Sequence, residues 1–331
     1  MKIYKPSYFD DFRCIAATCP DSCCKEWDVQ VDEASALMYR SLSGDLGDRL
    51  RQVLKDEDGE TVMTILDGRC PMWRTDGLCR IQAALGHDAL CKTCRQFPRL
   101  THEYGDFAEL GLELSCPEAA RIIFSSLPAP FLCEIVPGGE AAEYDEDVMA
   151  ILQKSREEAL SLLSDSCFSL REALAILLLY GYAVQEQIDG GEEAQLIPQA
   201  MLASAASFAQ QSDPQKLLDF FAELEILTPK WSARLSNPNP APWDDGLRPL
   251  ARYCVERYWL QAVSDYDLVC RVKFILTTCI TVHLLGGDPV ATSQLYSKEI
   301  ENSAENMDTL LDAAYTSPAL TDVKLLGHLL F

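Results

Sequence analysis

The stretch CIAATCPDSCCKEWDVQVD, residues 14–32, holds four cysteines and then alternates apolar and polar residues. Nine of the fourteen cysteines lie in the first 116 residues, whereas the other five are scattered through the rest of the chain. Because the cytosol keeps thiols reduced, this clustering predicts an N-terminal region organised by metal coordination rather than by disulfides. The scattered five are typical of cysteines that only pack: Cys133, Cys167, Cys254, Cys270 and Cys279.

The chain of 331 residues is acidic, with 28 Lys and Arg against 51 Asp and Glu and a formal charge of −23. Such a charge repels phosphate backbones and anionic lipid, so we expect no nucleic-acid or membrane partner and favour a lysine-bearing protein. The N-terminal residues 1–13 are charged and polar where a signal peptide needs an apolar stretch, which predicts a cytoplasmic protein. The most apolar segment, residues 173–184, is shorter than the roughly 20 residues of a membrane span.

Residues 1–125 have the pattern of a small lobe built from short, interrupted elements. Asp32 is a candidate cap for a helix over 33–41. Composition predicts further helices at 46–55 and 77–86, and strands at 27–32, 61–73 and 105–116. A region built from such short elements needs cross-links to be stable, and bound metal would supply them.

Residues 126–331 change to long amphipathic or buried segments, which predict a second lobe that is all helical. The proline-rich segment 236–246 must interrupt it as a loop. The predicted fold is therefore mainly α, with a small irregular α+β cysteine-rich metal-binding lobe before an all-α lobe. The predicted helices cover 145–164, 169–188, 194–210, 214–227, 246–263, 266–285, 289–302 and 305–315.

The spacing of the N-terminal cysteines is typical of a metal site. Cys91 and Cys94 form a C-x2-C unit, in which two intervening residues let both sulfurs turn toward one ion. Tetrahedral zinc and iron–sulfur clusters both take four thiolates, so nine candidates allow two sites and one spare. The candidate metal ligands are Cys14, Cys19, Cys23, Cys24, Cys70, Cys79, Cys91, Cys94 and Cys116.

Spacing alone does not choose between zinc and iron, and redox-active or structural disulfides or plain core cysteines remain alternatives. The C-x3-C-x2-C triplet of most radical enzymes that cleave S-adenosylmethionine is missing, because Cys24 follows Cys23 at once. Among the four histidines, His102 is the best further ligand candidate because it is near the thiols in sequence. Cations that would stabilise thiolates are interspersed: Lys25, Arg69, Arg74, Arg80, Lys92, Arg95 and Arg99.

Three ordered blocks, residues 14–32, 68–99 and 112–123, resemble the flagellin lysine-N-methylase family of the FliB type. Their N-terminal part is similar to a wider group of proteins with zinc- or iron-chelating cysteine domains. Residues 258–275 resemble a helical stretch of the same family. The resemblance implies methyl transfer from S-adenosylmethionine to lysines of flagellin, with an iron–sulfur centre held by the matched cysteines.

No catalytic base follows from the resemblance. The segment SDYD, residues 264–267, could contact a lysine ammonium, although Ser or Asp before an apolar run is ordinarily a helix cap. No G-x-G-x-x-G turn is present, so S-adenosylmethionine would bind outside a classical Rossmann domain, with its methionine part near the metal. The competing interpretation is a non-catalytic adaptor or redox sensor in which the metal only stabilises the fold.

Overall fold

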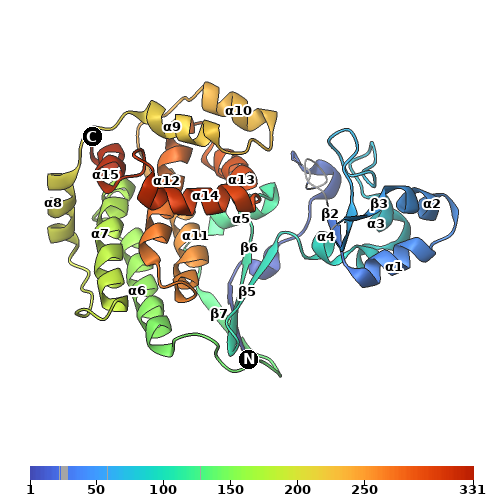
Figure 1. The fold of residues 1–331 in the computed structure, drawn as a ribbon, viewed down its shortest axis with the longest axis horizontal. Helices are drawn as coiled ribbons and strands as arrows, with labels where there is room; N and C mark the ends of the chain where they lie inside the picture. Colours follow the sequence, from blue (N-terminus) through green and yellow to red (C-terminus); the bar gives the residue numbers. More distant parts are fainter. Residues whose placement is uncertain (22, 24–28, 58, 127) are drawn as a thin grey trace.

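The computed structural model describes residues 1–331 except 22, 24–28, 58 and 127. A body of helices lies on one side, a small lobe of short helices and strands lies on the other, and a sheet lies between them (Figure 1). The small lobe, called here the cysteine-rich lobe, comprises strands β2–β4 and helices α1–α4. The predicted class, mainly α with a small α+β N-terminal part, is confirmed.

The cysteine-rich lobe has a core of its own. Its antiparallel sheet has the strand order β2-β4-β3, and its buried side chains, among them Tyr39, Leu50 and Met72, form a cluster separate from the main core. Asp32 caps α1 as predicted, since its side chain accepts from the amide of Ser35. The elements are β2 (Val29–Val31), α1 (Glu33–Ser41), α2 (Gly44–Val53), β3 (Leu54–Glu57), β4 (Glu60–Met63), α3 (Arg80–Leu85) and α4 (Lys92–Gln96).

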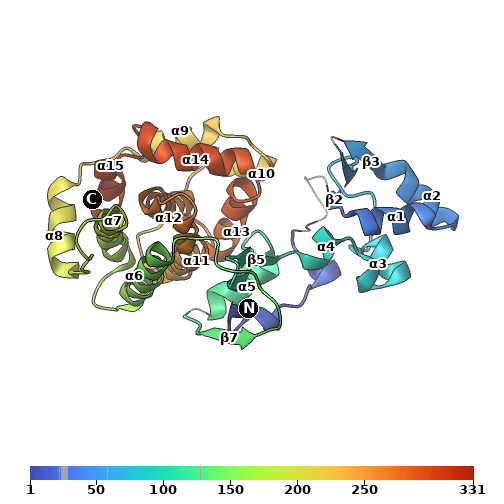
Figure 2. The same ribbon diagram turned by 60° about the horizontal axis from the view of Figure 1, so that its bottom comes forward.

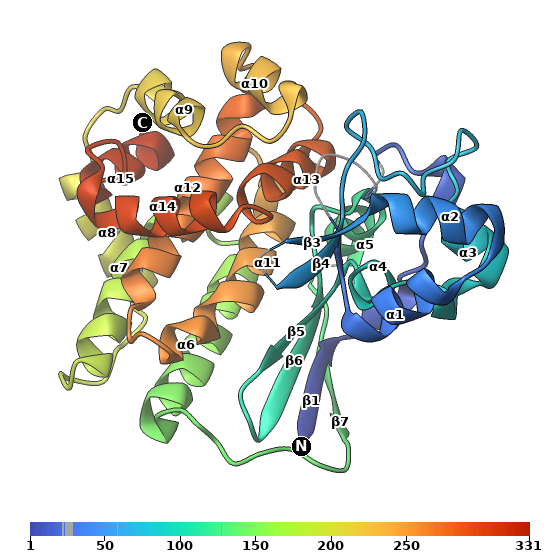
Figure 3. The ribbon, with the colours of Figure 1, turned by 45° about the vertical axis from the view of Figure 1, so that its right-hand side comes forward.

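A four-stranded sheet of order β5-β6-β1-β7 joins the cysteine-rich lobe to the helices (Figure 3). Its strands are β1 (Lys2–Pro6), β5 (Arg99–Glu103), β6 (Phe107–Leu112) and β7 (Phe131–Ile135). Strand β1 runs parallel to β6 and antiparallel to β7. Because β7 lies beyond residue 125 and pairs with the N-terminal strand, the prediction that everything after 125 is helical was wrong for this edge strand.

The helical body surrounds α12, which lies at its centre (Figure 2). By length and composition α12 would be able to cross a membrane, but 94% of it is buried inside the fold, as expected for a helix that is apolar on all sides. The helices are α5 (Pro117–Ser126), α6 (Glu146–Ser164), α7 (Leu170–Ile188), α8 (Pro198–Phe208), α9 (Pro214–Glu223), α10 (Pro229–Ser236), α11 (Arg248–Tyr258), α12 (Leu268–Leu285), α13 (Pro289–Ile300), α14 (Ala304–Thr316) and α15 (Asp322–Leu330).

All eight helices predicted after residue 126 are present, with shifted ends. Helix α8 starts at Pro198 rather than 194, because proline suits the first turn of a helix but not its interior. The helix predicted over 246–263 is α11 followed by a 3-10 segment, Trp259–Val263. Four α-helices of the described chain were not predicted, namely α4, α5, α10 and α15, each of which is short.

Candidate functional site

Six of the nine candidate cysteines line one cavity, of about 390 Å³, where the cysteine-rich lobe meets α5 and α13. Cys14 and Cys19 flank the 3-10 helix Ala16–Thr18. Cys79 is the N-cap of α3, Cys94 lies within α4, and Cys116 directly precedes α5. We call this space the cysteine cavity, and its sulfurs come from Cys14, Cys19, Cys23, Cys79, Cys94 and Cys116.

The other three candidates lie elsewhere or cannot be placed. Cys91, the N-cap of α4, is buried and interacts with the thiol of Cys94. Cys70 is buried in the core of the cysteine-rich lobe, where its Sγ lies 3.6 Å from Sδ of Met63. The prediction for Cys24 falls outside the described residues.

The pKa shifts in this region show which thiols lie close enough to affect one another. The pKa of Cys116 is raised to about 11, mainly by burial, and charge on Cys19 and Cys14 adds to the rise. The pKa of Cys91 is lowered to about 7, mainly by a hydrogen bond with Cys94. Burial raises the pKa of the nearby Tyr39, and charge on Cys91, Cys94 and Cys79 raises it further. Cys14 and Cys19 thus lie near enough to affect Cys116, and Cys79, Cys91 and Cys94 lie near enough to affect Tyr39.

Cationic side chains line the cysteine cavity, as expected for a site that stabilises thiolates. Of the predicted cations, Arg95 and Arg99 are among them, and the Arg99 guanidinium lies 5.1 Å from the ring centre of Phe12. Arg69 is not, since it stacks on Trp73 at 4.1 Å. Lys25 lies outside the described residues. Arg13 and Lys298 also line the cavity, and neither was predicted from the sequence.

Helix α13 closes the cavity and links the body to the cysteine-rich segment. Gln294 donates to Ser115 O at 2.7 Å and to Asp21 Oδ2 at 3.1 Å, and Lys298 Nζ lies 3.3 Å from the same carboxylate. Gln294 and Lys298 are four residues apart, so they share one face of α13. Asp21 lies between Cys19 and Cys23 in the sequence, and this position could have identified it as part of the site.

The thiols converge without forming a closed set of ligands. Within the described ranges, no three Cys, His, Asp or Glu side chains are grouped so that they could hold one metal ion. The cysteines and the positive charge around them are the groups that a thiolate-bound metal centre needs. In the structure, however, the thiols line the walls of the cavity and do not surround one point. His102, the favoured histidine, is not part of it, and His87 lines the cavity instead.

The prediction that SDYD is mainly a helix cap is confirmed for Asp267, which accepts from the amide of Cys270 at the start of α12. Asp265 forms an ion pair with Arg271 at 2.8 Å. Both carboxylates are therefore engaged by the local structure.

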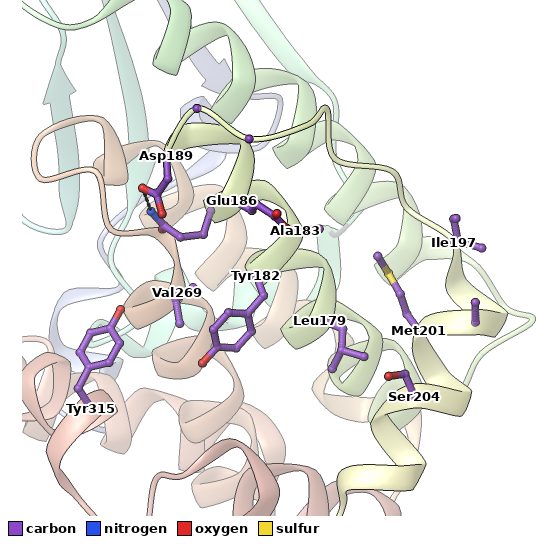
Figure 4. Close-up of a pocket in the computed structure, with 14 residues that line it drawn as sticks. Leu179, Tyr182, Ala183, Glu186, Asp189, Ile197, Met201, Ser204, Val269 and Tyr315 are labelled. Carbon is purple, nitrogen blue, oxygen red and sulfur yellow. Dashed lines mark hydrogen bonds between the residues drawn. The ribbon is translucent and has the colours of Figure 1, made fainter.

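A large groove, of about 1050 Å³, lies between α7 and α8 and extends to Tyr315 of α14 (Figure 4). Leu179, Tyr182 and Met201 give it an apolar wall, and Glu186 and Asp189 lie at one end. No cysteine or histidine of the described chain lines this groove. Its chemistry is that of an open surface groove, so the cysteine cavity remains the candidate site.

Comparison with known proteins bears on the same question. No family model matches the chain, and no solved structure matches it. The chain is 32% identical over 139 residues to proteins named lysine-N-methylase from Salmonella choleraesuis (strain SC-B67) and Salmonella typhimurium. Each match covers 40% of this chain and 35% of the relative, so the chain spans about a third of their length.

A third relative matches along most of its length. The flagellar biosynthetic protein FliU of Salmonella muenchen is 32% identical over 139 residues, which is 40% of this chain and 82% of that protein. The resemblance deduced from the three cysteine blocks is thereby confirmed. The chain belongs to the family that comprises the lysine-N-methylases of the FliB type and FliU.

Proposed function

We propose that this protein transfers methyl groups from S-adenosylmethionine to lysine side chains of flagellin or a similar lysine-bearing protein. The proposal includes a cysteine-ligated iron–sulfur centre, with zinc as the alternative metal, and a cytoplasmic location. The observation that carries it is the convergence of six cysteines on one cavity between two parts of the fold. Membership of the lysine-N-methylase family supplies the reaction class.

The size and the lining of the cysteine cavity support this proposal. Its volume of about 390 Å³ lies within the usual range of small-molecule sites, roughly 300 to 1,000 Å³. A metal centre would draw its ligands from the cavity thiols, which would have to move closer together around the ion than they lie in the described part of the chain. A bound metal would neutralise the thiolates and offer a Lewis-acidic contact to the methionine part of the methyl donor.

The chain's own residues would bind and orient the donor and the substrate. Arg13, Arg95 and Arg99 line the cavity and carry the charge that a carboxylate of the donor would meet. The net charge of −23 draws a lysine-rich protein toward the surface, while it opposes binding to nucleic acid or anionic lipid.

Methyl labelling of flagellin tests the proposed reaction. The full chain, purified without oxygen, is incubated with S-adenosylmethionine carrying an isotopic methyl group and with purified flagellin. We expect label on lysine residues, located by mass spectrometry of the digested flagellin. Flagellin whose lysines have been acetylated beforehand serves as the control and should remain unlabelled, because its amines are blocked. Unlabelled native flagellin, with metal-loaded protein, would refute the proposed function.

One observation favours the rival, a redox sensor or adaptor without catalytic activity. The lowered pKa of Cys91, which results mainly from its hydrogen bond with Cys94, increases its thiolate fraction near neutral pH. A C-x2-C pair with such a thiol is also suited to reversible oxidation. Reversible loss of the Cys91 and Cys94 thiols on mild oxidation, together with unlabelled flagellin, would favour this function.

A further inference from the structure

A second cavity lies at the other end of the central sheet, away from the cysteines. It is an open cleft of about 760 Å³ between the β5–β6 hairpin, the residues just before α6 and the turn that precedes α12. We call it the tyrosine cleft, because its walls include three tyrosines. The side chains used below are Tyr104, Tyr144, Tyr266, Glu103, Glu143 and His102.

Two of the tyrosine rings are held in fixed positions. Tyr104 stacks on Phe107 with ring centres 4.7 Å apart and planes 20° apart, and Tyr144 meets Tyr104 edge-on at 6.4 Å. The Tyr144 hydroxyl donates to Asp106 Oδ1 at 2.8 Å. Rings that are already ordered lose little conformational entropy when a ligand binds, so this wall is preorganised.

The third ring is presented by an uncommon backbone conformation. Tyr266 has a φ of 61°, in the left-handed region that residues other than glycine rarely adopt. Its amide donates to Ala262 O and its carbonyl accepts from Gln185 Nε2, each at 2.8 Å. The side chain is 47% exposed. The surrounding contacts thus hold an aromatic side chain at the mouth of the cleft, and strain of this kind clusters at functional sites.

The polar groups of the cleft suit a cation. Glu103 and Glu143 are exposed carboxylates on its wall. His102 Nε2 is buried and has no hydrogen-bond partner within the described part of the chain. Burial and the charge of Arg257 lower the pKa of His102, which keeps its ring neutral, so His102 adds no positive charge to the wall of the cleft.

We propose that the tyrosine cleft binds a lysine side chain of the substrate protein, at a docking position separate from the cysteine cavity. The tyrosine faces would contact the ammonium and its alkyl stem, and the two glutamates would balance the charge. Arg99 of β5 lines the cysteine cavity and Glu103 of the same strand lines the tyrosine cleft, so the two sites lie about 13 Å apart along the strand. The choice of lysine as the occupant rests on the proposed function.

Calorimetry on the full chain, without methyl donor, tests this inference. The probe is a short peptide of serine and alanine with one lysine, and its partner peptide carries norleucine, which keeps the alkyl stem but lacks the ammonium. We expect the norleucine peptide to bind about tenfold more weakly. Tyr266→Ala and the double variant Glu103→Gln with Glu143→Gln should each weaken lysine-peptide binding to a similar extent.

Two further variants serve as controls. Tyr266→Phe keeps the ring face and should retain binding, which separates loss of the ring from disturbance of the turn. Glu223→Gln removes an exposed carboxylate at the end of α9, outside the cleft, and should leave binding unchanged.

Equal affinity for the two peptides, or unaltered binding by Tyr266→Ala, would overturn the inference. The test does not depend on catalysis. If the lysine peptide binds but flagellin stays unlabelled, the proposed function is refuted and the docking inference stands. Conversely, labelling of flagellin with the same KM in wild type and Tyr266→Ala would refute the docking role alone.

Discussion

Glu256 of α11 is a carboxyl buried under the central sheet, 9% exposed, beside a small cavity of about 40 Å³. Its Oε1 lies 3.6 Å from Arg252 Nη2, too far for a hydrogen bond but close enough for an ion pair. Burial raises the pKa of Glu256 from its ordinary value of 4.5 to about 7, although Arg252 and Arg156 oppose the shift. A carboxyl in this position costs stability whenever it is ionised.

The raised pKa predicts how Glu256→Gln changes the pH dependence of stability. Between about pH 4.5 and 7 the folded protein holds a proton that the unfolded chain releases, so this carboxyl lowers the free energy of unfolding as pH rises. The amide removes that effect. We expect the free energy of unfolding of the variant, relative to that of wild type, to rise by about 2 kcal/mol between pH 5 and pH 8. Urea unfolding at both pH values measures this change.

Two buried histidines, His102 and His283, change the free energy of unfolding with pH in the opposite direction to Glu256. Burial lowers the pKa of His102, and it lowers that of His283 to about 4, so both favour the folded state less as pH falls below 6.5. The comparison of Glu256→Gln with wild type cancels their contribution. A difference between the two proteins that does not change with pH would contradict the buried ionisation of Glu256.

At the scale of elements, Asp32 joins two helices of the cysteine-rich lobe. Its Oδ1 accepts from the amide of Ser35 at 3.0 Å, which caps α1, and its Oδ2 accepts from the amide of Lys92 at 2.7 Å, at the first turn of α4. Helix α4 follows Cys91 and carries Cys94. One carboxylate therefore sets the position of two candidate ligands.

Asp32→Ala should loosen α1 and α4 together, because it leaves two helix-terminal amides without their acceptor. Loss of an N-cap typically costs about 1 kcal/mol, and loss of the second bond adds to that. We expect faster hydrogen–deuterium exchange of the amides in both helices, measured by mass spectrometry. Asp45→Ala, which removes an exposed carboxylate from α2, is the control and should change exchange little. Faster exchange confined to α1 would show that Asp32 does not support α4.

The same elements show what the sequence could predict. Caps such as Asp32 and Asp267, and long helices such as α7 and α12, follow from short-range patterns and were confirmed. Strand β7 was missed because its partner is β1, more than 120 residues away, and an edge strand with exposed side chains has little apolar alternation. Local signals do not contain such pairings.

At the scale of the whole molecule, the cysteine cavity depends on contacts between distant parts of the chain. The clustering of cysteines predicted that their sulfurs converge around metal, with nine candidates allowing two sites, and six of the nine line one cavity. It did not predict that Lys298 and Gln294 of α13 would reach Asp21, because some 270 residues separate them. It also did not predict that Cys70 lies beside Met63 and outside the lining of the cavity, since that placement results from tertiary packing.

Metal and sulfide analysis of the full chain, purified without oxygen, tests the central claim that these cysteines hold a metal centre. The wild type is compared with Cys116→Ser, which removes a cavity thiol, and with Cys167→Ser, which removes an exposed cysteine outside the cavity. We predict bound iron with acid-labile sulfide, or zinc without sulfide, at a fixed ratio to protein in wild type and Cys167→Ser, and a clear loss in Cys116→Ser. A wild-type protein without bound metal, or a metal content that Cys116→Ser leaves unchanged, would contradict the claim.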